Sequence, residues 1–194
     1  MSILRYLLSV LIVLTLSLNL SGCASLLTAA DSDAIEDDRG ERTFGASMDD
    51  ESIETKAKVN VHAANEAFDD AHISIISYNA YVLIVGQVPS EELKQQASDV
   101  IREVRRVRRI YNELEVTGNT SFMTRTSDTW ITGKVKTNLI ANPETEGLRV
   151  KVVTENGVVY LMGLASRAEA DRIVDVASAS YGVRKVVRLF EYID

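Results

Sequence analysis

After its first fifty residues the chain repeats itself, and this duplication limits the folds it can adopt. The repeated residues keep their order while their spacing falls from 78 to 76: Ile53, Lys56 and Lys58 recur as Ile131, Lys134 and Lys136, Asn79 and Gly86 as Asn156 and Gly163, and Val107-Arg108 as Val183-Arg184. Copies of roughly 65 residues are too long for a solenoid repeat and long enough to form a small core. The sequence therefore predicts two tandem domains, which we place at residues 50–116 and 126–194 with a joint at 117–125.

The second copy shows the order of its elements most clearly. LRVKVVT alternates like a half-buried strand, Asn156-Gly157 is a strong hairpin signal, and VVYLMGL is a second strand. Ser166 and Glu169 form a capping box that opens a helix, Gly182 ends this helix, and VRKVVRLFEYI is a third strand. The first copy repeats the pattern, with a helix from about Asp50. We expect an α+β fold in which each domain places two helices on one face of a three-stranded mixed sheet.

Several strands are apolar on both faces, among them VVYLMGL and YVLIVG. The sheet face without helices would then expose apolar surface to water, at a cost of about 25 cal/mol per Å². We therefore expect the two domains to pack against each other.

The N-terminal residues have the features of an export signal. Arg5 precedes an apolar run from residue 6 to 18, and Leu-Ser-Gly-Cys follows at positions 20–23. This tetrapeptide resembles the bacterial lipobox, so residues 1–22 are predicted to be a lipoprotein signal peptide and Cys23 the lipidated residue. Cys23 is the sole cysteine, which excludes an intrachain disulfide. A free thiol behind an ordinary signal peptide is the alternative.

The acidity of the chain is concentrated behind this cysteine. The net charge is −7, and residues 23–54 contain ten acidic and two basic residues. We interpret residues 23–49 as an acidic, flexible linker that keeps the folded domains at a distance from the anchor.

The segment from Asp128 to Asn142 predicts a helix with two apolar faces. Ile131, Val135 and Leu139 form the face expected to point inward. The opposite face carries the only tryptophan of the chain, and Lys134 and Lys136 border this face. The residues of the face are Trp130, Gly133, Thr137, Ile140 and Ala141. Such a face suits an interfacial helix among anionic lipid headgroups. In the alternative interpretation a partner domain covers the face, or the tryptophan caps the core.

The duplicated unit resembles the BON domain. Two such units behind a lipobox, with DTWITGKV and TENGVVYLMGL in the second, are similar to dual-BON outer-membrane lipoproteins associated with cell division and envelope stress. The resemblance implies an acylated (palmitate-bearing) protein on the periplasmic side of the outer membrane, with enrichment at the division septum. It also implies that the first helix of the second domain binds phosphatidylglycerol and cardiolipin, and that the protein supports envelope integrity. A periplasmic adaptor that uses the same face, for example with the β-barrel assembly machinery, is the alternative.

Other chemistry has little support in the sequence. His62 and His72 lack neighbours at metal-ligand spacing, no phosphate-binding glycine motif is present, and we expect neither enzymatic activity nor a cofactor. The arginine-rich run from Arg102 to Arg109 either lies at a helix C-terminus or forms a second anion contact. Nucleic acid is not an expected partner.

The first helix of the first domain lacks the tryptophan on its outward face. We therefore expect only the second domain to bind anionic vesicles. The corresponding residues of the first domain are Ser52, Thr55, Val59, His62 and Ala63.

Overall fold

The computed structural model describes residues 38–194. The predicted signal peptide, Cys23 and most of the predicted linker lie outside the described residues. Within the described part, no helix has the length and the apolar character needed to cross a membrane.

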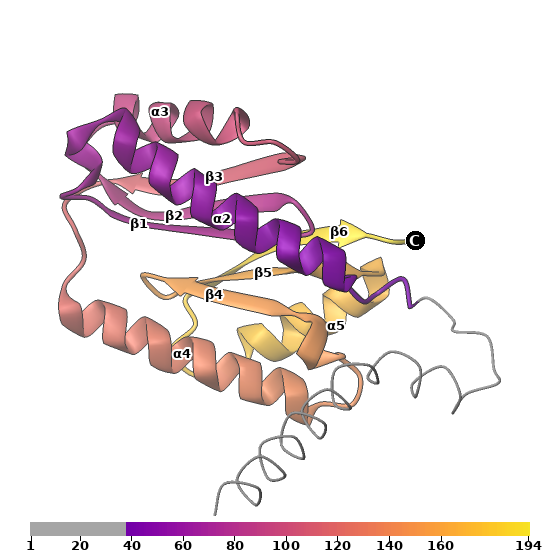
Figure 1. The fold of residues 1–194 in the computed structure, drawn as a ribbon. Coiled ribbons are helices and arrows are strands. Elements are labelled where there is room, and N and C mark those ends of the chain that lie inside the picture. Colours follow the sequence, from indigo (N-terminus) through magenta and orange to yellow (C-terminus); the bar gives the residue numbers. More distant parts are fainter. Residues whose placement is uncertain (1–37) are drawn as a thin grey trace, which may run out of the picture. The chain divides into compact units, whose positions relative to one another are not determined.

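Each domain has the predicted order of helix, strand, strand, helix, strand (Figure 1). The first domain contains α2 (Phe44–Ala64), the 3₁₀ turn η1 (Glu66–Phe68), β1 (His72–Tyr78), β2 (Tyr81–Val88), α3 (Glu91–Arg102) and β3 (Arg109–Val116). The second domain contains α4 (Phe122–Ala141), the 3₁₀ turn η2 (Gly147–Arg149), β4 (Lys151–Glu155), β5 (Val158–Ala165), α5 (Arg167–Ser178) and β6 (Lys185–Tyr192). In both sheets the central strand pairs antiparallel with the strand before it and parallel with the last strand. The predicted fold class and the mixed sheets are confirmed.

The first helix of each domain begins earlier than the sequence suggested. α2 begins at Phe44, inside the predicted linker, and α4 begins at Phe122, inside the predicted joint. The Thr43 side chain accepts a hydrogen bond from the backbone N–H of Ala46, and Ser121 does the same for Thr124. These hydroxyl caps stabilise first turns that lack a buried apolar face. The linker prediction was therefore wrong for residues 44–49, where acidic composition concealed a capped helix.

Three apolar cores divide the described part of the protein, residues 38–194, into layers. One core lies between α2, α3 and the first sheet, and a second lies between α4, α5 and the second sheet. The third joins the helix-free faces of the two sheets, and its buried members are Tyr78, Leu83, Val85, Tyr160, Met162 and Leu189. The order of layers is thus helices, sheet, sheet, helices, and the predicted packing of one domain against the other is confirmed.

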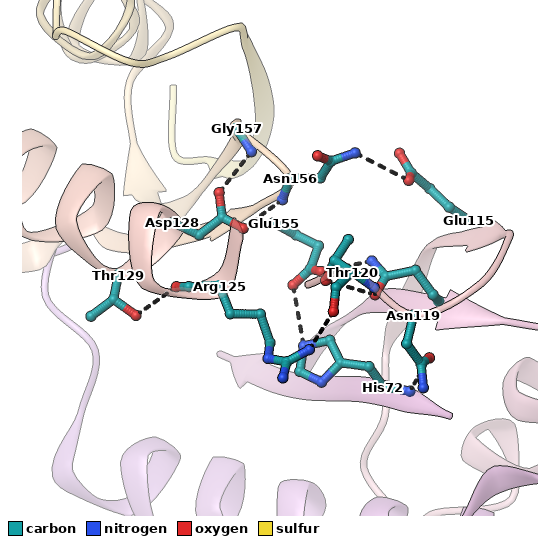
Figure 2. A network of polar contacts seen from close by, with 11 residues as sticks. His72, Glu115, Asn119, Thr120, Arg125, Asp128, Thr129, Glu155, Asn156 and Gly157 are labelled. Atoms are coloured by element: carbon teal, nitrogen blue, oxygen red, sulfur yellow. Dashed lines mark hydrogen bonds and ion pairs between the residues drawn. The ribbon is translucent and has the colours of Figure 1, made fainter. Parts of the chain in front are cut away.

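Polar contacts also join the domains across this third core. The Gln87 amide donates to the buried carboxylate of Glu155 over 2.7 Å, and Arg108 forms two hydrogen bonds to Glu191 of 2.8 and 3.0 Å. The Thr120 hydroxyl, in the joint, donates to the Oε1 atom of Gln87 over 3.1 Å. Figure 2 shows the part of this network around the joint. The Thr120 carbonyl oxygen also accepts a hydrogen bond from Arg125 of α4, so the joint contacts both domains.

A buried aspartate in each first helix holds the hairpin of its own domain. Asp128 accepts hydrogen bonds from the backbone N–H groups of Asn156 and Gly157, each 2.8 Å long (Figure 2). Both turn residues have positive φ, 48° and 72°, which the Asn-Gly pair adopts at low cost. Asp50 holds the corresponding turn of the first domain, although this turn lacks glycine. Neither aspartate was singled out in the sequence.

Candidate lipid-binding face on helix α4

The two faces of α4 separate as the sequence predicted. Ile131, Val135 and Leu139 are 4%, 0% and 0% exposed and pack into the core of the second domain. Six of the seven predicted site residues are exposed on the outer side of the helix: Trp130, Gly133, Lys134, Thr137, Ile140 and Ala141. Trp130 and Ile140 keep 53% and 49% of their surface accessible. Within residues 38–194, the first domain therefore leaves this face uncovered.

The seventh predicted residue, Lys136, is held by the protein itself. Its Nζ atom donates to the carbonyl oxygens of Gly147 and Val150 over 2.8 and 2.6 Å, with Leu148 at 3.4 Å. Burial lowers the pKa of its ammonium group below the ordinary value, and the nearby charge of Lys151 contributes to the same effect. Lys136 thus fixes the η2 turn to the helix, whereas Lys134 forms no ion pair among residues 38–194.

Trp130 has an aromatic neighbour that sequence periodicity did not reveal. The ring of Tyr181, in the turn between α5 and β6, meets the indole edge to face, with centroids 6.0 Å apart and planes at 85°. Tyr181 is 81% exposed. The next residue, Gly182, has a φ of 90°, and a Cβ atom there would lie 3.0 Å from the Ile131 side chain. The glycine therefore lets the turn approach α4 closely enough to form the pair.

A second exposed apolar residue lies at the other side of the helix. Leu148, in η2, is 80% exposed. The preceding residue, Gly147, touches the α4 backbone, because a Cβ atom there would lie 2.4 Å from the carbonyl carbon of Leu139. Leu148 consequently lies beside the C-terminal half of α4. We define the α4 face by its residues Trp130, Lys134, Ile140, Leu148 and Tyr181.

The arginine-rich run of the first domain is only partly a helix end. α3 ends at Arg102, so the following arginines lie in the turn before β3 or in its first residue. Three arginines form ion pairs: Arg102 with Asp99, Arg106 with Asp49, and Arg108 with Glu191. The helix-dipole interpretation therefore applies to Arg102 and not to the rest of the run.

Each of the two histidines has one carboxylate partner among the described residues. His62 Nδ1 lies 2.9 Å from Asp69, and His72 Nε2 lies 3.7 Å from Glu155. In residues 38–194 no group of three histidine, cysteine or carboxylate side chains is arranged to hold a metal ion.

Comparison with known proteins now decides the family. The family model described as BON domain matches residues 49–118 and 127–194. The chain belongs to the BON-domain family. Both matches begin near the buried aspartate of the first helix and end after the last strand of the unit. This places the α4 face in the second BON domain.

The chain is similar to several named proteins, one of which is an outer membrane lipoprotein. The chain is 33% identical to the outer membrane lipoprotein DolP of Haemophilus influenzae, over 94% of this chain and 95% of that protein. It is 34% identical to a 21 kDa hemolysin of Actinobacillus pleuropneumoniae, over 78% of each chain. It is 30% identical to the osmotically inducible protein Y of Escherichia coli, over 73% and 72%. These similarities support an envelope-associated lipoprotein.

Proposed function

We propose that this protein is a lipid-anchored outer-membrane lipoprotein, facing the periplasm, whose second BON domain binds anionic phospholipid through the α4 face. The observation that carries the proposal is the exposed Trp130–Tyr181 pair beside the exposed Lys134. Aromatic rings at the headgroup level, with a cation at their edge, form the usual arrangement of a helix that lies in a membrane interface. Phosphatidylglycerol and cardiolipin are the anionic lipids we propose.

Most of the binding free energy should come from apolar insertion. Burial of one large apolar side chain stabilises a complex by about 1.5–3 kcal/mol, and Trp130, Tyr181, Ile140 and Leu148 can all enter the headgroup region. A cation near an anionic surface adds about 1 kcal/mol. Lys134 is exposed on the face, and the carbonyl groups that hold Lys136 are neutral and do not cancel its charge, so both lysines contribute to this electrostatic part. Salt should therefore weaken vesicle binding without abolishing it.

Cosedimentation with vesicles tests the proposal. Residues 24–194 include the whole compact unit from residue 38 onward and lack the anchor cysteine. We expect this protein to sediment with vesicles that contain phosphatidylglycerol or cardiolipin and to stay in the supernatant with purely zwitterionic vesicles. Equal sedimentation with both, or with neither, would contradict the proposal.

The anchor is the second part of the proposal. The lipobox ending in Cys23 and the similarity to an outer membrane lipoprotein support acylation of this cysteine. Ala24 follows the cysteine, where an aspartate would be the usual inner-membrane retention signal. We expect the native protein in the outer-membrane fraction and the Cys23→Ala variant outside it. Recovery of the native protein in the inner membrane would disprove this location.

We further propose that the protein supports envelope integrity and is enriched at the division site. An adaptor that docks on the β-barrel assembly machinery would use the same α4 face. The vesicle experiment separates the two functions, because an adaptor needs no anionic lipid to bind its partner. If the protein is an adaptor, the wild-type protein should not bind vesicles, and substitution of Trp130 should reduce capture of the protein partner.

A further inference from the structure

The first domain has a cationic groove at the position where the second domain has its aromatic pair. The groove lies between α2 and the turn that precedes β3, and its volume is about 240 Å³. Its lining residues are Asp49, Ser52, Ile53, Lys56, Arg105 and Arg106. Three of these six side chains are cations and one is an anion.

The duplication shows that groove and aromatic pair occupy equivalent places. On α2, Ser52 and Lys56 correspond to Trp130 and Lys134 of α4. In the turn, Arg105 corresponds to Tyr181, and Arg106 corresponds to Gly182. The two domains therefore differ in side chains at the same place in the fold. The second domain has an exposed aromatic pair there, and the first domain has a hydroxyl and a guanidinium group.

Arg106 is an exposed residue whose backbone adopts the conformation that glycine has at the equivalent place in the second domain. Its φ is 74°, close to the 90° of Gly182, and residues other than glycine adopt this region only with backbone strain. An ion pair with Asp49 holds the Arg106 side chain beside α2. The side chain is thus fixed at the rim of the groove, at the expense of backbone strain that glycine avoids in the second domain.

We propose that the groove binds a phosphate group. With Asp49 paired to Arg106, the remaining charge of the lining is that of Lys56 and Arg105, which matches a phosphate of up to two negative charges. Among residues 38–194, Lys56 and Arg105 form no ion pair that would compete. Guanidinium groups bind phosphate oxygens in a planar fork, and the Ser52 hydroxyl offers a further donor.

This site is independent of the α4 face. The helix layers lie on opposite sides of the paired sheets, so a flat bilayer against α4 leaves the groove uncovered. The phosphate can come from a soluble phosphate compound or from a lipid headgroup, and the groove offers no exposed aromatic side chain for insertion into a bilayer.

Amide chemical shifts during a titration of residues 24–194 with inorganic phosphate test the proposal. Sodium chloride at equal ionic strength is the reference. We expect saturable shifts at residues 52–56 and 105–106, and at least tenfold weaker binding in both Arg105→Ala and Lys56→Ala. Arg102→Ala is the matched control, because Arg102 belongs to the same arginine run, is exposed and lies outside the groove lining. Its affinity should equal that of the wild type.

Two results would overturn the proposal. Shifts spread evenly over the basic residues would show nonspecific ion binding, and unchanged affinity in Arg105→Ala and Lys56→Ala would exclude the groove. Dispersed spectra confirm that each variant is folded. The source of the phosphate is resolved in the Trp130→Glu background, where the α4 face is disabled. Amide shifts at the groove residues with glycerol 3-phosphate alone indicate a soluble ligand, and the same shifts with anionic vesicles indicate a lipid headgroup. Both readouts come from residues of the first domain, so they remain valid if the α4 face proves not to bind lipid.

Discussion

Replacement of Asp50 by alanine should lower the free energy of unfolding by about 3–5 kcal/mol. The Asp50 carboxylate is 2% exposed and accepts hydrogen bonds from the backbone N–H groups of Asn79 and Ala80, each 2.8 Å long. It also accepts from the Ser77 hydroxyl at 2.6 Å and from Arg42 at 2.7 Å. Alanine would leave the buried Ser77 hydroxyl and the partly buried Asn79 and Ala80 N–H groups without this acceptor. A domain of this kind has only about 5–15 kcal/mol of stability, so the loss would be severe.

Denaturant unfolding of three variants measures this effect. Asp99→Ala is the control, because Asp99 pairs with Arg102 at the surface, and exposed pairs contribute about 0–1 kcal/mol. Asp128→Ala should fall between the two, since Asp128 accepts only the two turn N–H groups. If Asp50→Ala is no less stable than Asp99→Ala, the helix-to-hairpin contact does not hold the first domain together.

These aspartates also show where sequence reasoning failed. Strands, hairpins and capped helices followed from alternation, Asn-Gly and Ser-x-x-Glu, which are local signals. The second copy carries all three, and the repeat extended the same order of elements to the first copy. A buried carboxylate has no local signal of its own. Asp50 lies in an acidic stretch of the sequence, which predicts an exposed side chain. In the structure its carboxylate is instead the centre of a hydrogen-bond network.

The candidate site was predictable to the extent that it lies on one helix. Helical periodicity separated the buried residues of α4 from the exposed ones, because that separation depends only on the 100° step between residues. Tyr181 and Leu148 come from turns that are distant in sequence, and tertiary contacts at Gly182 and Gly147 bring them to α4. The occupation of Lys136 by the η2 carbonyl groups likewise depends on tertiary structure.

Substitution of Trp130 by glutamate should remove vesicle binding and leave the fold intact. The change removes the largest side chain that can insert and places a negative charge against anionic lipid, a combined loss of about 2–4 kcal/mol, or more than tenfold in affinity. In the folded protein, Trp130 is 53% exposed and loses mainly its contact with Tyr181, worth about 0.5–1.5 kcal/mol. The melting temperature should fall by no more than about 5 °C.

The most direct test of the α4 face compares Trp130→Glu with Val59→Glu by vesicle cosedimentation and thermal unfolding. Val59 is 61% exposed on the outer side of α2, so its substitution adds the same charge and removes an exposed apolar side chain in the first domain. We expect Val59→Glu to bind vesicles with phosphatidylglycerol like the wild type, and Trp130→Glu to stay in the supernatant with a near-normal melting temperature. Unchanged binding of Trp130→Glu, or a fall of its melting temperature by many degrees, would contradict lipid binding by the α4 face.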